Sequence, residues 1–291
     1  MYKIIHKQII AEDIKKIDIV APAIALRSVP GQFVMVTPTA GERNIPMTIV
    51  DSDEKRSVIS LIVHETGSAT QKLGDIPIGE GPYQMVGPLG RGAMIDKYGL
   101  VVCVATGIGA AQILPICRGL KKKGNKVIGI IGAKSKKVLM LEAQMRVVCD
   151  EIFIATNDGS YERKGLATQL LKELLNKYTV QRVYAIGSVE MMQAASRMTL
   201  ERGIPLRVTV APPMINGLGL CGSCRVKIDG QYRLACVEGP EFDGHLVDYQ
   251  ELSQRMNASE SLSCTNQNHP LNPKTSGLAV FVKSLWGSVK K

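Results

Sequence analysis

Short apolar runs separated by turn residues fill the first third of the chain. They cover residues 33–36, 47–50, 58–63 and 83–86. Short strands at such regular spacing are typical of a small antiparallel barrel. We therefore expect a β-barrel domain over residues 1–95.

A different pattern follows over residues 96–210, where apolar strands alternate with amphipathic helices. The expected strands are 100–105, 127–131, 151–155, 182–186 and 206–210, and the expected helices are 110–122, 138–148, 165–177 and 189–201. Strand and helix alternate in this way in a doubly wound parallel sheet, which commonly binds nucleotides. The expected fold class is therefore an antiparallel β-barrel followed by a doubly wound α/β domain.

Two further segments complete the chain. Residues 211–256 are expected to form a small C-terminal subdomain of short strands and loops that carries a cluster of cysteines. Residues 257–291 are rich in serine and asparagine and are expected to form a flexible tail. This tail contains an apolar patch at 278–286 that could dock on a partner, although a loosely ordered terminus is the simpler interpretation.

One stretch could imitate a membrane span, because residues 99–117 carry no formal charge and are followed by a basic run. Its first part is continuous and β-branched, as in a strand buried on both faces. A glycine turn comes next, and Gln112 and Pro115 interrupt the helical run after it. We predict a strand, a turn and a helix, with no membrane span. The N-terminus shows no secretory signal, so we expect a cytoplasmic protein.

Composition narrows the possible functions. A length of 291 residues suits about two domains. The net charge of +10 suits a protein that holds phosphates and meets an acidic partner. No basic run is interleaved with aromatic residues, so nucleic-acid binding is not expected. The seven cysteines are too unevenly placed for a disulfide scaffold, since three lie between positions 221 and 236, and metal binding explains this crowding better.

The crowded cysteines are Cys221, Cys224 and Cys236, with the spacing C-x₂-C-x₁₁-C. Plant-type [2Fe–2S] sites use C-x₄-C-x₂-C and a distant fourth cysteine. Here the first of these positions is Asn216, in a loop that keeps its glycines. A neutral amide is a poor ligand for iron beside thiolates, so the fourth ligand stays open. The alternatives are a zinc site that would recruit His245, and a redox dithiol that would leave Cys236 unexplained.

Two glycine-bearing segments suggest nucleotide cofactors. Gly107 and Gly109 lie between an expected strand and an expected helix, where a backbone can approach a pyrophosphate, although a plain tight turn would look the same. In the barrel, residues 43–48 combine an arginine, a proline-fixed strand and a hydroxyl, and a hydroxyl-rich glycine turn follows at 67–70. Such groups suit a flavin dinucleotide, but surface strands often carry the same residues.

The chain resembles the ferredoxin–NADP reductase-like electron-transfer subunits, because it combines a flavin-type barrel, a nucleotide fold and C-x₂-C-x₁₁-C in this order. The resemblance covers residues 1 to about 256 and is most specific over 221–226 and 236–245. It is strongest to the small subunits of NADH-dependent reduced ferredoxin:NADP⁺ oxidoreductases, also called sulfide dehydrogenases. The electron-transfer subunit of dihydroorotate dehydrogenase is similar but more distant.

The resemblance implies FAD, NAD(H) and a [2Fe–2S] cluster as cofactors. The residues that it assigns to FAD are Arg43, Pro46, Met47, Thr48, Val63, Gly67, Ser68 and Thr70; to the nicotinamide dinucleotide, Gly107, Gly109, Asp158, Gly159, Gly187, Ser188 and Met191; and to the cluster, Cys221, Cys224 and Cys236, with Asn216 at the fourth position. Thr48 would lie near the flavin N5 and adjust it without acting as an acid or base. The family commonly has aspartate where this chain has Asn216, and tends to have Ala-Pro where this chain has Ala111-Gln112.

The function that the resemblance implies is electron transfer from NAD(H) through FAD and the cluster to a larger flavoprotein or iron–sulfur subunit, with ferredoxin as a further partner. Two alternatives stay open: another host complex, linked to dihydroorotate or sulfur, and a non-catalytic assembly subunit that has lost the cluster. The nucleotide is expected to be NAD, although the basic segment 133–137 after the second strand could accept the 2′-phosphate of NADP.

Overall fold

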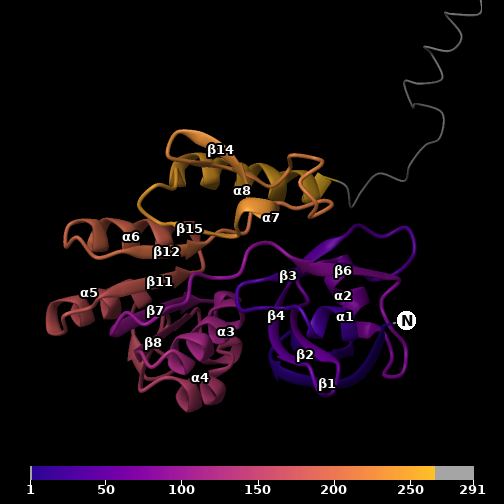
Figure 1. Ribbon diagram of the computed structural model, residues 1–291, viewed down its shortest axis with the longest axis horizontal. Helices are drawn as coiled ribbons and strands as arrows, with labels where there is room; N and C mark the ends of the chain where they lie inside the picture. Colours follow the sequence, from indigo (N-terminus) through magenta and orange to yellow (C-terminus); the bar gives the residue numbers. More distant parts are fainter. Residues whose placement is uncertain (1, 266–291) are drawn as a thin grey trace, which may run out of the picture.

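The computed structural model describes residues 2–265, with side chains described as far as residue 258. The barrel and the α/β domain lie side by side, and the C-terminal subdomain lies across the top of both (Figure 1). The apolar patch expected at 278–286 is outside the described residues. No helix within the described part of the chain is long and apolar enough to cross a membrane.

The N-terminal domain is one six-stranded antiparallel sheet with the strand order β1-β2-β5-β4-β3-β6. Its elements are β1 (Lys3–Ala11), β2 (Ile14–Val20), α1 (Pro22–Ala25), β3 (Phe33–Thr37), β4 (Ile45–Asp53), β5 (Val58–His64), α2 (Ser68–Asp75) and β6 (Gln84–Leu89). Side chains alternate between the two faces of the sheet: Ile17 and Ile19 of β2 point into the barrel core, while Lys16 and Asp18 point outward. The predicted barrel is confirmed.

The α/β domain contains a seven-stranded sheet with the order β10-β9-β8-β7-β11-β12-β15. The strands are β7 (Leu100–Thr106), β8 (Lys126–Ala133), β9 (Glu151–Thr156), β10 (Arg163–Lys164), β11 (Arg182–Ile186), β12 (Leu206–Thr209) and β15 (Glu241–Asp243). All are parallel except β15, which runs antiparallel to β12. The predicted doubly wound sheet is confirmed, and the strand order reverses direction between β7 and β11.

Helices cover both faces of this sheet. They are α3 (Gly109–Lys122), α4 (Glu142–Val148), α5 (Ala167–Lys177) and α6 (Val189–Leu200). Val102 and Val104 of β7 pack in the core with α5, whereas Val101 and Cys103 pack beneath α3. The helix expected at 138–148 begins only at Glu142, after a 3₁₀ turn at Lys136–Val138, because Leu141 has a left-handed φ of 60° that a continuous helix cannot contain.

The C-terminal subdomain consists of a hairpin, two helices and the strand β15. The hairpin and helices are β13 (Arg225–Ile228), β14 (Gln231–Leu234), α7 (Ala235–Glu238) and α8 (Tyr249–Thr265). Helix α8, which crosses the expected tail boundary at residue 257, was not predicted from the sequence. Its composition gives little helical periodicity, and the helix is held by Tyr249 and Leu252, which are buried in the core of the α/β domain.

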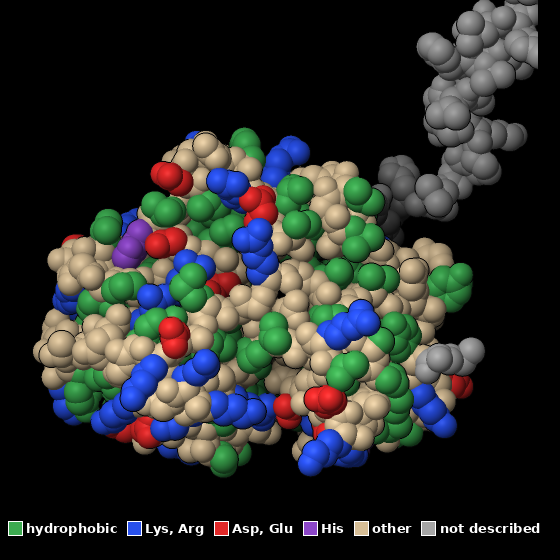
Figure 2. Space-filling model, viewed as in Figure 1, with side chains coloured by type: hydrophobic (Ala, Val, Ile, Leu, Met, Phe, Trp, Pro, Cys, Tyr) green, Lys and Arg blue, Asp and Glu red, His purple; other side chains and the backbone are tan. Residues whose placement is uncertain are grey.

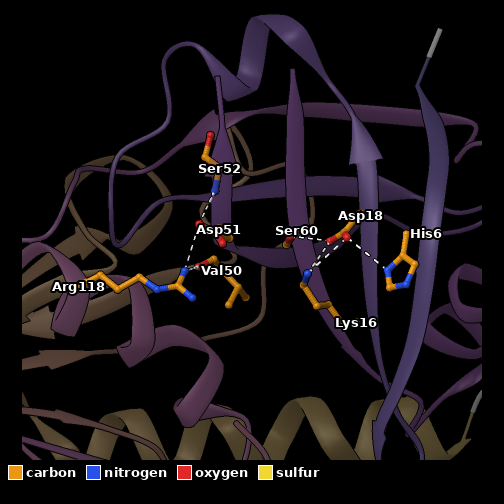
Figure 3. Close-up of polar contacts among 8 residues, drawn as sticks. All are labelled: His6, Lys16, Asp18, Val50, Asp51, Ser52, Ser60 and Arg118. Atoms are coloured by element: carbon orange, nitrogen blue, oxygen red, sulfur yellow. Dashed lines mark hydrogen bonds and ion pairs between the residues drawn. The ribbon is translucent and has the colours of Figure 1, made fainter. Parts of the chain in front are cut away.

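The barrel and the α/β domain share an apolar interface. Ile14, Val50 and Ile62, on the outer face of the barrel sheet, belong to the same core as α3. Arg118 of α3 forms an ion pair with Asp51 at 3.0 Å and reaches the Val50 carbonyl oxygen at 3.4 Å (Figure 3). This contact holds α3 against the barrel.

Candidate functional site

A small cavity of about 80 Å³ lies where the barrel, α3 and the segment after β12 meet. Its lining residues are Gly31, Phe33, Pro46, Thr48, Gln112, Thr209, Val210, Ala211, Pro212, Met214 and Pro240. Pro46 and Thr48 were expected at the flavin. Gln112 contributes an amide to the opposite wall. The part played by the segment 209–214 was not expected from the sequence.

Strand periodicity divides the residues expected at the flavin into two groups. Pro46 and Thr48 of β4 line the cavity, while Met47 between them is buried in the barrel core. Val63 of β5 is likewise fully buried in that core. For Met47 and Val63 only the backbone is left to face a cofactor.

The N-terminus of α2 offers a place for a phosphate group. Gly67 precedes the helix, and the Thr70 hydroxyl both accepts from the Gly67 N–H at 3.1 Å and donates to the Gly67 carbonyl at 2.8 Å. The Thr70 hydroxyl is therefore occupied, whereas Ser68 is exposed. An ion pair between Lys72 and Glu42 holds α2 against the loop that carries the exposed Arg43. Helix N–H groups and a nearby guanidinium fit the pyrophosphate of a dinucleotide.

The glycines after β7 and β11 allow two segments to approach closely at the switch in strand order. A Cβ on Gly109 would lie 2.8 Å from the carbonyl carbon of Ile186, so only glycine lets α3 begin against the end of β11. A Cβ on Gly187 would collide with the Thr106 hydroxyl, and this hydroxyl accepts a hydrogen bond from Ser188 N–H at 3.2 Å. Gly107 has a left-handed φ of 54°. Ligands of doubly wound sheets bind at this switch point.

Two other expected nucleotide residues have structural partners. Ser188 caps α6 by accepting from the Met191 N–H at 3.3 Å, and Met191 is buried beside Gly187. The buried Met191 can therefore shape the crevice wall mainly through its backbone, whereas the exposed Ser188 hydroxyl keeps its proton to donate.

The loop after β9 lies beside the basic segment after β8. Asp158, followed by Gly159, accepts hydrogen bonds from the hydroxyl and N–H of Ser160, which hold the pKa of its carboxyl below the usual value. The Ser160 hydroxyl also accepts from the Lys136 N–H at 2.8 Å, and the Lys136 ammonium lies 4.7 Å from the centre of the Tyr161 ring. This edge of the sheet, where a ribose is expected, therefore contains both a carboxylate and lysines.

The three cysteines lie on and near one glycine-rich loop. Cys224 and Cys236 are buried, and their sulfur atoms are 3.1 Å apart without a disulfide bond. Burial and the neighbouring Cys224 raise the pKa of the Cys236 thiol to about 12. Cys221 is exposed, and the Ser223 hydroxyl, followed by the N–H groups of Ser223, Asn216 and Ile215, lowers its pKa to about 7.

The loop conformation explains why glycines surround these cysteines. Gly217, Gly219 and Gly222 have left-handed φ angles of 72°, 79° and 67°. A Cβ on Gly217 would lie 2.5 Å from Met35, and one on Gly219 would lie 2.7 Å from Val237. The tight turns bring backbone N–H groups close to the sulfur atoms, which is the environment that an iron–sulfur cluster requires.

The three cysteines provide free thiols that could hold a dinuclear cluster. One pair of neighbouring thiols and one separate thiol can each serve a different iron. Among the described residues, no group of three or more His, Cys, Asp and Glu side chains is arranged to hold a metal ion. His245, the zinc candidate, instead places Nε2 2.9 Å from the Thr199 hydroxyl. At the fourth position, the Asn216 side-chain oxygen accepts from the Leu218 N–H at 2.9 Å.

The cavity and the cysteine loop are continuous. Met214 lines the cavity, and Ile215 and Asn216 begin the loop. The side chain of Asn44, next to Arg43, donates a hydrogen bond to the Ile215 carbonyl at 3.1 Å. The sequence motif contains Asn44, but only the folded chain shows that it joins the barrel to the cysteine loop.

A reductase-like barrel, a doubly wound nucleotide domain and a three-cysteine loop define the class of ferredoxin reductase-like electron-transfer proteins. Comparison with known proteins agrees. Residues 212–248 match the model of the iron-sulfur cluster binding domain of dihydroorotate dehydrogenase B. Phthalate dioxygenase reductase, with 17% identity over 78% of this chain and 85% of its own and a TM-score of 0.57, shares the fold.

More similar proteins identify the family. The dihydroorotate dehydrogenase B electron transfer subunit homolog of Thermotoga maritima is 34% identical, covering 87% of this chain and 90% of that protein. The corresponding subunit of Desulforamulus reducens is 33% identical, covering 82% and 94%. A chain of the NADH-dependent reduced ferredoxin-NADP oxidoreductase structure is 31% identical, covers 92% of this chain and 98% of its own, and has a TM-score of 0.85. The chain belongs to the family of dihydroorotate dehydrogenase B-type electron-transfer subunits.

Proposed function

We propose that this chain carries FAD and a [2Fe–2S] cluster and transfers electrons between NAD(H) and a larger partner oxidoreductase subunit. The main support is that one cavity is bounded by the barrel residues Pro46 and Thr48, by Gln112 of the nucleotide domain, and by Met214 at the start of the cysteine loop. A flavin ring at this cavity would lie between the nucleotide crevice and the cluster. The three cofactors would then follow one another in the order that electron transfer needs.

The flavin, when bound, supplies the chemistry by accepting a hydride and releasing single electrons. Arg43 and the N-terminus of α2 would hold its pyrophosphate, and Pro46 and Thr48 would orient its ring. The apolar side chains of Phe33 and Met214, which also line the cavity, would help to exclude water from it. We expect no side chain of the chain to act as an acid or base in hydride transfer, because the flavin carries the chemistry.

The partner subunit is proposed to dock over the cysteine loop. Cys221 is exposed there, and so are the apolar side chains of Ile215, Leu218 and Leu220. Apolar side chains are also visible over the upper part of the molecule in Figure 2. Exposed apolar groups of this kind suit a protein contact.

A ferredoxin partner and a cytoplasmic location both stay predictions.

The names of the similar proteins support two host complexes. Subunits of dihydroorotate dehydrogenase B and a chain of a ferredoxin-NADP oxidoreductase are almost equally similar to this chain. We favour the second, because the resemblance over residues 221–226 and 236–245 is strongest to those small subunits. Co-purification of the partner from the native cell would decide: a partner that oxidises dihydroorotate would overturn this choice.

The proposed electron transfer can be tested directly. Protein purified and reconstituted anaerobically should contain flavin and about two irons per chain. NADH should bleach the flavin absorbance and then reduce the cluster. Flavin without NADH-dependent bleaching would contradict the proposal, and protein without iron would favour the assembly role. A parallel titration with NADPH tests the basic segment at 133–137, because a preference for NADPH would overturn the choice of NAD.

A further inference from the structure

We propose that the Ser223 hydroxyl donates a hydrogen bond to the Cys221 thiolate and thereby raises the reduction potential of the cluster. Ser223 is then a positioning and tuning residue of the cluster loop. This inference rests on the cluster proposed above, but it concerns a residue to which neither the sequence motifs nor the comparisons assign a role.

The geometry places the hydroxyl where it can act. Ser223 Oγ lies 3.2 Å from Cys221 Sγ, which is within hydrogen-bonding distance for sulfur. The Ile215 N–H donates to the same oxygen at 3.2 Å. A serine hydroxyl has one proton to donate. Because the Ile215 N–H occupies only a lone pair of the Ser223 oxygen, the hydroxyl proton of Ser223 can point at the Cys221 sulfur.

Metal binding would fix the direction of this hydrogen bond. A thiol and a hydroxyl can each donate, but a thiolate bound to iron has no proton and can only accept. Ser223 must then be the donor. The positive end of its O–H dipole would stabilise the extra negative charge of the reduced cluster, and hydrogen bonds to the sulfur atoms are among the factors that set cluster potentials.

The neighbouring polar side chain is already engaged. The Asn216 oxygen accepts from the Leu218 N–H two residues later, so this side chain stabilises its own turn. Cys224 and Cys236 are buried and close to each other, whereas Cys221 lies at the exposed end of the site. Ser223 therefore acts on the thiolate nearest the protein surface, where an electron would leave for a partner.

Three variants of the full chain test the proposal. Ser223→Ala removes the donor, Ser223→Thr keeps it, and Ser253→Ala on α8 is a matched control outside the loop. Each protein is reconstituted with iron and sulfide, its iron content is measured, and the cluster is titrated with dithionite while its EPR signal is followed. We expect Ser223→Ala to shift the midpoint potential to a more negative value at unchanged iron content, and the other two variants to match the wild type.

Each other outcome is decisive. An unchanged potential in Ser223→Ala would show that the hydroxyl does not bond to the thiolate. Loss of iron in Ser223→Ala alone would show that Ser223 is needed to hold the cluster in its loop, which overturns the tuning role. Failure of the proposed function looks different, because the wild-type protein would then bind no iron or would not be reduced by NADH.

Discussion

Replacing Gly109 by alanine would test whether the start of α3 and the end of β11 form the dinucleotide crevice. The new Cβ would lie 2.8 Å from the carbonyl carbon of Ile186 and 3.2 Å from the nitrogen of Gly187. Carbon atoms normally pack at about 3.5–4.0 Å, so the two segments must separate by about 1 Å. The neighbouring atoms are backbone rather than flexible side chains, and overpacking of this kind costs about 1–3 kcal/mol.

This separation should act on the nucleotide more than on the flavin. Gly109 contacts β11 of the α/β domain, while the groups proposed for FAD lie on the barrel. A loss of about 1.4 kcal/mol in binding corresponds to a tenfold weaker affinity. We therefore expect NADH to bind about tenfold more weakly or worse, with unchanged flavin content. The NADH concentration that gives half the maximal rate of flavin bleaching measures the affinity, and urea unfolding measures the stability.

A matched control separates the steric clash from backbone strain. Gly203 has a left-handed φ of 63°, but a Cβ there would meet no atom within 4 Å. Gly203→Ala should therefore carry only the conformational cost of about 1–2 kcal/mol and leave NADH binding unchanged. An unchanged NADH affinity in Gly109→Ala, or an equal loss in both variants, would refute the crevice assignment.

Three further predictions concern stability and the cluster. Burial raises the pKa of Glu241, although the Met94 N–H and Arg207 oppose this effect in part. Ionisation of Glu241 should therefore lower the stability of the protein as the pH rises from about 4.5 through the raised pKa. Urea unfolding of Glu241→Gln should lack this fall in stability, and parallel pH curves for the two proteins would refute the prediction. Burial alone would raise the pKa of Asp18, but hydrogen bonds from Ser60 and Lys16 lower it below its ordinary value of 3.8 (Figure 3), so this stabilisation is present above pH 3.8 and is lost as the pH falls through the lowered pKa. Asp18→Asn should cost about 1 kcal/mol at neutral pH and less in acid, and a cost that does not vary with pH in thermal unfolding would contradict this. Asn216→Asp should leave the iron content intact or increase it, whereas Cys224→Ser should reduce or abolish it. Unchanged iron content in Cys224→Ser would remove Cys224 from the cluster, and loss of iron in Asn216→Asp would contradict the prediction for that position.

The helices and strands could be predicted from the sequence wherever the local hydrophobic periodicity agrees with the burial in the folded chain. The strand at 100–105 was expected from its β-branched residues, and β7 (Leu100–Thr106) follows because it is buried on both faces of a parallel sheet. The start of α4 was not readable, since only tertiary packing keeps Leu141 in a left-handed conformation. The helix α8 was missed for a related reason, because its polar composition hides a few residues that are buried against α6 and β13.

For the site, the sequence alone determined the chemical groups: three cysteines at cluster spacing, glycines at two strand ends, and an Arg-x-x-Pro-x-Thr segment. Residue type and spacing are local properties, so they are visible in a linear chain. The tertiary structure decided which of these groups meet. It turned Met47 and Val63 into the barrel core, brought Gln112 and Met214 to the cavity wall, and joined Asn44 to the Ile215 carbonyl. These outcomes depend on contacts between segments far apart in the sequence, and such contacts are set by packing rather than by local pattern.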